Sequence, residues 1–335
     1  MKQIYLATCL LFLWLTSSSN VFRINNTKAT SEQQKIFNTV QEAHDFSGTK
    51  AGDTLMIEGS SLPYAEVVLN KPLVLIGPGY FLTQNPQTQS NTLDARMRRI
   101  TLNPLAAGTI LEGLSFAVGS SAYTPAVAAN NAIIRKCLLS SAIHLSDRSS
   151  GLQVIGCYFE SNALGISTTA YTATNIAFKN NIVIGHLNVA ATPSWQNNFS
   201  VVEHNVIGGS VEVTASIFRS NILMNGLATF KINSNNIQNN LLAGTQFTGN
   251  GNQTYGLKQI FGSPAGRSAD GMYSLAAGSE YIAAGYDGSQ PGVFGGTTGY
   301  VLSGIPPIPV IYEFLADGSA NKEAGLLVTI KAKAN

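Results

Sequence analysis

The chain has 335 residues, of which 44% are hydrophobic and only 11% are charged, against about 25% charged residues in typical soluble domains. Its net charge of +2 is too small to indicate a nucleic-acid or membrane-surface partner, and no basic run interleaved with aromatic residues suggests nucleic-acid binding. The length predicts one or two domains, and a surface rich in small polar residues favours an extracellular β-rich protein.

Residues 1–19 predict a secretory signal peptide. A positive start at Lys2 precedes an apolar stretch over residues 4–15, and three serines at 17–19 supply small residues for cleavage. The apolar stretch is shorter than the ~20 residues that a spanning helix needs, so an uncleaved anchor is the less favoured alternative. We expect a secreted or cell-surface protein, with the periplasm as another possibility and no membrane span after cleavage.

The chain then predicts a capping helix and three strands. Ser31 and Gln34 have the spacing of a capping box, and apolar residues at 36, 40 and 43 share one face of a helix over residues 31–48. A turn and a strand are expected over residues 52–59, and further strands at 64–69 and 73–77. A short amphipathic helix in this place would cover the first strand edges of a solenoid.

An internal repeat follows, in which apolar residues flank a recurring Asn, Cys or Gly. Copies begin 16 to 24 residues apart, which is the period of stacked coils that bury a shared core and pair through parallel ladders. Leucine-rich repeats are disfavoured because no Leu-rich consensus or helical half-repeat is present. The recurring position holds Gly113, Cys137, Cys157, Asn181, Asn205, Asn221 and Asn240.

The repeated polar residue has a structural explanation. Asn side chains stacked coil upon coil can bond backbone amides that would otherwise be buried without partners. Cys137 and Cys157 occupy this position in successive coils, so we expect them to be neighbours. They are expected to be buried thiols rather than a disulfide, because parallel neighbours rarely reach the disulfide torsion.

The opening of the chain resembles that of pectin-lyase-like β-helix proteins. The resemblance is carried by residues 39–43 (TVQEA), by 52–54 (GDT), by Gly59, Tyr64 and Glu66, and by 75–77 (LIG). That superfamily includes pectate lyases, pectin methylesterases, polygalacturonases and exported bacterial proteins without an assigned activity. The resemblance covers roughly residues 20–250 and implies an all-β, right-handed parallel β-helix with an N-terminal capping helix.

Residues 252–335 are predicted to be a C-terminal cap or extension, following a β-helix over residues 20–251. Residues 272–288 resemble the closing segment of exported β-helices, which often have an Asp-Gly turn followed by Asp-x-Gly-Ala. This chain has Asp287-Gly288 but lacks the second Asp, so any role of that residue in relatives is in doubt here. Residues 310–314 and 326–330 are predicted to pair as a hairpin across Gly318.

No catalytic or metal site is evident in the repeats. The acids between residues 110 and 250 are Glu112, Asp147, Glu160, Glu203 and Glu212, and none forms a close pair in sequence. Glycosidases need paired carboxylates, and Ca²⁺-dependent lyases need clustered carboxylates. The histidines are dispersed, and His144 with Asp147 and Arg148 is expected to be loop surface. Catalytic residues are therefore unassigned, and no metal or cofactor is expected unless the protein is a Ca²⁺-dependent lyase.

One column of side chains is a candidate for ligand binding. Two places before the recurring position stand Arg135, Ile155, Lys179, Glu203, Arg219 and Gln238, which strand alternation directs outward. With the adjacent Lys136, the cations Arg135, Lys179 and Arg219 could follow an acidic polysaccharide. The alternative is ordinary surface charge, screened by salt, that keeps the chain soluble.

We expect an exported, non-catalytic β-helix protein that binds glycans or acts as an adhesive at the cell surface. One alternative is a polysaccharide lyase or related carbohydrate-active enzyme acting on acidic polysaccharide, which the resemblance supports but fold alone does not establish. A second alternative is a purely structural extracellular component. The expected partner is a polysaccharide, and the chain is expected to be a monomer.

Overall fold

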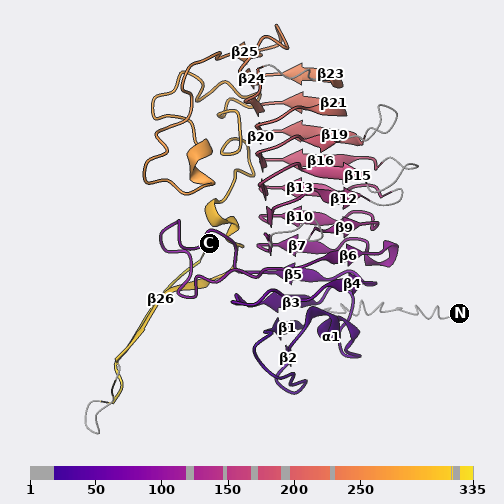
Figure 1. Cartoon of the computed structure of the whole chain (residues 1–335), viewed down its shortest axis with the longest axis vertical. Coiled ribbons are helices and arrows are strands. Elements are labelled where there is room, and N and C mark those ends of the chain that lie inside the picture. Colours follow the sequence, from indigo (N-terminus) through magenta and orange to yellow (C-terminus); the bar gives the residue numbers. More distant parts are fainter. Residues whose placement is uncertain are drawn as a thin grey trace, which may run out of the picture.

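The computed structural model describes residues 19–117, 124–145, 149–166, 173–189, 197–226, 231–317, 319 and 325–334. The predicted signal peptide lies outside these residues except for Ser19, and so do Asp147, Arg148 and Gly318. Within the described part of the chain, the strands form sheets of 11, 8, 6 and 2 strands. Figure 1 shows the first three as the sides of one stack of coils.

The 11-stranded sheet contains, in spatial order, β2 (Ile36–Phe37), β1 (Val21–Ile24), β3 (Thr54–Ile57), β5 (Val74–Ile76), β7 (Ile110–Glu112), β10 (Ile133–Arg135), β13 (Gln153–Ile155), β16 (Ile176–Lys179), β19 (Asn198–Glu203), β21 (Glu212–Arg219) and β23 (Lys231–Gln238). The 8-stranded sheet contains β25 (Gln253–Thr254), β24 (Leu241–Leu242), β22 (Ile222–Leu223), β20 (Val206–Ile207), β17 (Ile182–Val183), β14 (Tyr158–Phe159), β11 (Leu138–Leu139) and β8 (Ser115–Phe116). The 6-stranded sheet contains β18 (Asn188–Val189), β15 (Leu164–Ile166), β12 (Ile143–Leu145), β9 (Ala126–Val127), β6 (Ile100–Leu102) and β4 (Val67–Leu69).

Strands within these three sheets pair in parallel, each with the equivalent strand one coil away. Side chains that alternate inward fill the interior, where Phe116, Phe159, Phe178 and Phe218 are fully buried. The predicted parallel β-helix is thereby confirmed: the coils from β7 to β18 each supply one strand to each of the three ladders, and only stacking buries the apolar face of a coil.

The capping helix is shorter than predicted. It is α1 (Val40–Asp45), and its capping box is formed by Thr39 and Glu42, not by Ser31 and Gln34. Ser31 instead forms an antiparallel bridge with Ile36, and Ile36 is also the first residue of β2, which pairs in parallel with β1. Strand pairing therefore determines the conformation of residues 31–38, despite their local helical pattern. The described residues contain no helix that is long and apolar enough to cross a bilayer.

The expected asparagine ladder is present and one residue longer than predicted. Asn181, Asn205, Asn221, Asn240 and Asn252 follow one another, and each Oδ1 atom from Asn205 onward accepts from the backbone N–H and side-chain amide of the asparagine one coil earlier, at 2.8–3.1 Å. The Nδ2 atoms also donate to backbone carbonyls, as Asn205 does to that of Phe178 at 3.0 Å. The ladder therefore satisfies buried polar groups along the bend between the 11-stranded and 8-stranded sheets.

The predicted place of Gly113 in this ladder is wrong by one residue. Ile134 pairs with Leu111, and Leu138 pairs with Ser115, so Cys137 stands opposite Leu114. The two thiols, Cys137 and Cys157, are free and fully buried, as expected. Burial is the main cause that raises the pKa of the Cys137 thiol well above its usual value.

After β25 the chain returns along the side of the stack, beside the 8-stranded sheet (Figure 1). It contains two short 3-10 helices, η2 (Gly271–Tyr273) and η3 (Leu302–Gly304), and a third, η1 (Pro104–Ala106), lies among the early coils. A second apolar cluster joins the outward face of that sheet to the returning chain. Its members are Tyr80, Leu138, Tyr158, Ile182, Val206, Ile222, Leu241, Ile260, Leu275, Tyr281, Val293 and Tyr300.

Near the first coils, the returning chain is held by a buried polar group. The hydroxyls of Tyr80 and Tyr300 lie 2.5 Å apart, and the fully buried Asp270 accepts from the backbone N–H of Ser303 at 2.6 Å. The last strands form a two-stranded antiparallel hairpin of β26 (Val310–Ala316) and β27 (Val328–Lys333). A hairpin was predicted here, but its second strand lies at 328–333 instead of 326–330.

Candidate functional site

The predicted outward column is present in register. Arg135 pairs with Ile155, which pairs with Lys179, and Lys179 pairs with Glu203, which pairs with Arg219. Glu112 stands before Arg135 in the same column, which the misplaced Gly113 had concealed. The candidate cations therefore share one side of the stack, but they alternate with two carboxylates instead of forming a free row.

The first group of charges is Glu112, Arg135 and Lys136. Arg135 Nη2 lies 2.6 Å from Glu112 Oε2, and Lys136 Nζ lies 3.5 Å from Oε1. The Glu112 side chain is only 2% exposed, and its Oε1 atom accepts no hydrogen bond from the described residues. Burial lowers the pKa of Lys136, and the charge of Glu112 opposes this. Two cations face one carboxylate here, which leaves the group with a net positive charge.

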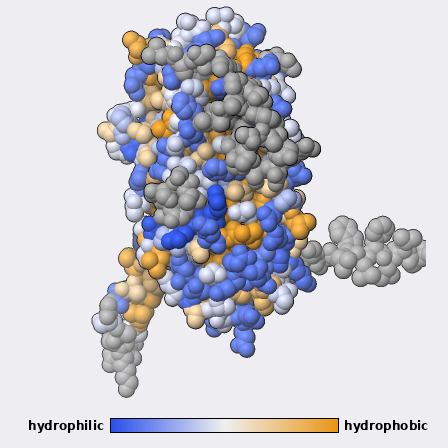
Figure 2. Space-filling model, turned by 45° about the vertical axis from the view of Figure 1, so that its right-hand side comes forward, coloured by the Kyte–Doolittle hydropathy of each residue, from blue (hydrophilic) through white to orange (hydrophobic). Residues whose placement is uncertain are grey.

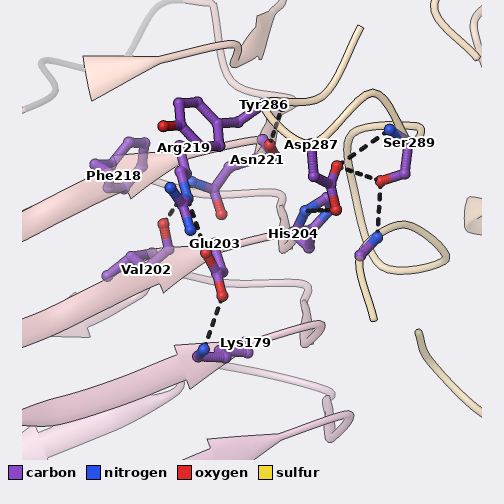
Figure 3. A network of polar contacts seen from close by, with 12 residues as sticks. Lys179, Val202, Glu203, His204, Phe218, Arg219, Asn221, Tyr286, Asp287 and Ser289 are labelled. Carbon is purple, nitrogen blue, oxygen red and sulfur yellow. Dashed lines mark hydrogen bonds and ion pairs between the residues drawn. The ribbon is translucent and has the colours of Figure 1, made fainter. Parts of the chain in front are cut away.

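The second group centres on Glu203 (Figure 3). Its Oε1 atom lies 2.8 Å from Lys179 Nζ and its Oε2 atom 2.9 Å from Arg219 Nε. Burial raises the pKa of Glu203, but hydrogen bonds from the two cations outweigh burial and leave that pKa below its usual value. The Arg219 guanidinium also lies 4.2 Å from the centre of the Tyr286 ring, a cation–π contact. Glu203 is therefore an ionised carboxylate that positions both cations.

A second column runs beside the first, and its residues have left-handed backbone conformations. We call it the left-handed column. It stands one residue before the asparagine ladder and consists of Gly113, Lys136, Gly156, Asn180, His204, Ser220 and Asn239, with φ between 51° and 64°. Glycine, Asn and His tolerate this region best, so the composition of the column follows from the sharp bend at this corner of each coil.

The left-handed column fastens the returning chain to the coils. Residues 284–305, which we call the return segment, meet its polar members one after another, from the last coils back toward the first. Asn239 Nδ2 donates to Ala284 O at 3.1 Å, Tyr286 N to Ser220 Oγ at 2.8 Å, Asn180 Nδ2 to Val293 O and Gly295 O at 2.8 Å, and Lys136 Nζ to Ile305 O at 3.1 Å.

His204 is the titratable member of this column. Its side chain is 6% exposed, and its Nε2 atom lies 3.7 Å from Asp287 Oδ2. Burial lowers the pKa of His204, while Asp287 and Glu203 oppose that shift. Burial raises the pKa of Asp287, but bonds from Ser289 and the nearby His204 bring it below its usual value. The pair is therefore a neutral imidazole beside an ionised carboxylate near neutral pH.

Two adjoining cavities lie between the outward column and the return segment, and we call them together the groove. One, of about 210 Å³, is lined by Lys179, Glu203, His204, Arg219, Tyr286 and Asp287 among others. The other, of about 370 Å³, is lined by Glu112, Arg135, Lys136 and neighbouring residues. Thr297 and Thr298 line both. The structure thus brings all four predicted binding residues, Arg135, Lys136, Lys179 and Arg219, to one groove.

Glycosidases use a pair of carboxyl groups, and the smaller cavity is lined by Glu203 and Asp287. Those enzymes need one protonated carboxyl group as acid, whereas the pKa values of Glu203 and Asp287 are both lowered. Among the described residues, no three His, Cys, Asp or Glu side chains are grouped to hold a metal ion. His144 in β12 is partly buried, with its pKa lowered by burial and by Arg99, and it does not line the groove.

Sequence reasoning missed the return-segment residues of the groove. Tyr286, Asp287, Thr297 and Thr298 come from outside the repeats, so no period marks them. Glu112 had a usable signal, because aligning Leu114 with Cys137 places it in the outward column. His204 also had one, since it immediately precedes a ladder asparagine as Asn180 and Asn239 do.

No protein-family model, no characterised protein and no solved structure matches the chain.

Proposed function

We propose that the protein is an exported, non-catalytic glycan-binding protein that holds an acidic saccharide in the groove. The observation that carries this proposal is the pair of guanidinium groups on its floor, which have more N–H donors than their described partners occupy. Arg135 donates to Glu112 through Nη2 and has its Nε–H buried, Arg219 donates to Glu203 through Nε, and each guanidinium has five N–H donors. The remaining donors match carboxylate or sulfate groups, which Arg binds through two parallel hydrogen bonds.

The other groups in the groove suit the uncharged parts of a sugar. Thr297, Thr298 and Tyr286 are exposed at its rim and offer hydroxyls and an aromatic ring. Glu112 lies beneath these groups, where its Oε1 atom is buried and 3.5 Å from Lys136 Nζ, so it holds the cations in place and leaves the contact with a sugar to the exposed groups. Arg135 and Arg219 stand four strand positions apart, about 19 Å at the spacing of β-strands, which is long enough for several sugar units.

Export, and membership of the pectin-lyase-like superfamily, belong to the same proposal. Support for export comes from the signal-peptide pattern of residues 1–19 and the low charge of the chain. Support for the superfamily comes from the parallel coils with an N-terminal capping helix and from the opening motifs of the sequence. Secretion to the medium, retention at the cell surface and a periplasmic location are distinguished by fractionating cells that express the natural chain.

A glycan panel tests the binding proposal. The protein, expressed from its own Met1 and purified in the form that accumulates, is presented with neutral, uronate and sulfated polysaccharides, with and without Ca²⁺. We expect uronate or sulfated glycans to bind and neutral ones to bind at least about tenfold more weakly. Arg135→Gln with Lys136→Gln should weaken binding, whereas Lys258→Gln should not, because Lys258 forms an exposed ion pair with Glu280 outside the groove.

A polysaccharide lyase is the second candidate, favoured by one observation. His204 is a neutral imidazole that lines the same cavity as two cations, and a neutral base near a cation-bound carboxylate is what proton abstraction requires. Ultraviolet absorbance of unsaturated sugar ends, recorded on the same panel, separates the two. Cleavage that His204→Asn abolishes would replace binding with catalysis, and neither binding nor cleavage would favour a purely structural component.

A further inference from the structure

The terminal hairpin stands away from the coils as an arm (Figure 1). At its base, Val310 is buried in a small cluster with Leu82 and Ile305, and Ser90 N donates to Ile311 O at 2.8 Å. Beyond this base, β26 and β27 make extensive contacts with each other, and no other helix or strand of the described chain contacts either of them extensively. The hairpin is therefore a two-stranded sheet without a layer beneath it.

Cross-strand pairs divide the hairpin into two different faces. Phe314 pairs with Ile330, and Ala316 pairs with Val328, so one face is apolar. The intervening pairs are Glu313 with Lys331 and Leu315 with Thr329, and the first of these is an ion pair at 2.8 Å. Strand alternation puts these two sets on opposite sides. The apolar face carries Phe314 at 54% exposure and Ile330 at 55%.

The apolar face of the hairpin is expected to pack against another protein or lipid surface. An isolated two-stranded hairpin is only marginally stable in water, and a hydrophobic face packed on another layer is what stabilises small sheets. Exposed apolar side chains that gather on one surface mark interaction sites. Figure 2 shows the coloured part of the arm as a largely hydrophobic surface that projects from a body of mixed hydropathy.

We propose that the apolar face of the hairpin pairs with the same face of a second copy of this chain. The large residues Phe314 and Ile330 are flanked by the small residues Ala316 and Ala332, so a two-fold axis lets the large side chains of one copy sit over the small ones of the other. Ionic repulsion does not oppose this contact, because Glu313 and Asp317 are balanced by Lys331 and Lys333 among the described hairpin residues.

A lipid bilayer fits this arm less well than a second copy. A bilayer would also have to accommodate the segment of chain between the two strands, in which residues 317–325 have the sequence DGSANKEAG, with three charged residues. Charges are costly in the hydrocarbon region, so the composition of this segment opposes insertion. The two-fold contact replaces the monomer expected from the sequence, and it is independent of glycan binding because β26 and β27 do not line the groove.

Sedimentation velocity and light scattering on the whole protein test the proposal over a range of concentrations. We expect a dimer whose dissociation constant rises at least about tenfold in the Phe314→Thr/Ile330→Thr variant. Threonine keeps the preference for a strand while removing apolar bulk. The matched control is Leu315→Thr, which changes an equally exposed residue on the other face and should leave the dimer intact.

Three outcomes overturn the proposal. They are a wild-type protein that stays monomeric at all concentrations, a dimer that the double variant does not weaken, and a dimer that Leu315→Thr weakens equally. Unchanged thermal unfolding of the coils in each variant shows that the protein still folds. Binding of the wild-type protein to anionic or neutral phospholipid vesicles, lost in the double variant while the protein stays monomeric, would identify a membrane as the occupant and also overturn the two-fold contact.

Discussion

The asparagine ladder and the left-handed column stand next to each other at the same bend, yet they are built by opposite rules. The ladder repeats one residue type from Asn181 to Asn252, whereas the left-handed column uses Gly, Lys, Asn, His and Ser in successive coils. Each ladder asparagine bonds to a copy of itself one coil away. Each polar member of the left-handed column meets a different part of the return segment.

The difference shows where a solenoid leaves room for function. A buried column with identical neighbours must keep its residue, because any change leaves amides of two coils without partners. A column with a unique neighbour can vary from coil to coil, and its variation is what brings His204, Asn180 and Lys136 under the return segment. The groove therefore lies beside the left-handed column, whose residues need not be the same from coil to coil.

The sharpest way to break the ladder is Asn205→Ala. The change removes the side-chain hydrogen bonds of Asn205 to Asn181, Asn221 and the carbonyl of Phe178 in the buried bend, and each buried group left without a partner costs about 1–3 kcal/mol. We expect the free energy of unfolding in urea to fall by about 3–5 kcal/mol.

The control is Asn252→Ala, which alters the partly exposed end of the ladder and should cost clearly less. Equal losses at the two positions would contradict a ladder whose worth depends on burial.

Substitutions of Asn180 break the fastening of the return segment. Asn180→Gly keeps the left-handed backbone but removes the bonds to Val293, Gly295 and Thr298, so unfolding should become easier by about 2–3 kcal/mol. Asn180→Ala should cost about 1 kcal/mol more, because alanine is strained at φ 53°. Hydrogen exchange should rise in residues 284–305 and stay unchanged in the coil interior; an interior that exchanges faster instead would refute local fastening.

The His204 pair predicts a pH dependence of stability. The pKa of His204 is lowered in the folded protein, while the unfolded chain takes up the proton near pH 6.5. The unfolded state then binds more protons between these two pKa values, so stability falls as the pH drops below about 6.5. Glu203 and Asp287, whose pKa values are also lowered, contribute only at more acidic pH.

Denaturant titrations at pH 7.5, 6.5 and 5.5 measure this effect. His204→Asn, which tolerates the left-handed backbone, should flatten the dependence. His144 also has a lowered pKa, so His144→Asn measures the share that arises outside the groove. If the slope survives in His204→Asn and disappears in His144→Asn, the assignment to His204 is wrong.

The smallest effect is expected at the paired thiols. Cys137 and Cys157 pack as small apolar groups, so Cys137→Ala should lower the free energy of unfolding by only about 1 kcal/mol. Because both thiols are buried and the pKa of Cys137 is raised, a thiol reagent should react with neither until the protein unfolds. Two unreactive cysteines in the unfolded, unreduced chain would reveal a disulfide and contradict the free thiols.

The sequence predicts most of the solenoid because, within the repeat, every residue packs beside its own equivalent. The parallel coils, the ladder, the paired cysteines and the register of the outward column follow from that rule. The hairpin could be predicted too, since its two apolar stretches flank a glycine-containing segment of the sequence. The error at Gly113 arose because a glycine fits both the ladder position and the left-handed position beside it.

Only one side of the groove could be predicted from the sequence. Its floor belongs to the repeat, so the positions of Arg135, Lys179 and Arg219 were predicted. Glu203 was placed in the same column, whereas Glu112, the partner of Arg135, could be placed there only with the correct register. Its other wall comes from residues that meet the coils across long separations, such as Asn180 with Thr298. The helix at residues 31–48 failed for a related reason: long-range pairing of β2 decided between two local capping patterns.

The separation between Tyr80 and Tyr300, which is 220 residues along the chain, dictates the order of maturation. Coils can assemble as soon as their neighbours have been synthesised, because each strand of the stack pairs with the equivalent strand of an adjacent coil. The outward face of the 8-stranded sheet, in contrast, stays bare until the last 80 or so residues arrive, since its cover includes Val293 and Tyr300. A chain without its return segment would expose to water a continuous apolar ribbon that includes Leu138, Tyr158, Ile182 and Val206.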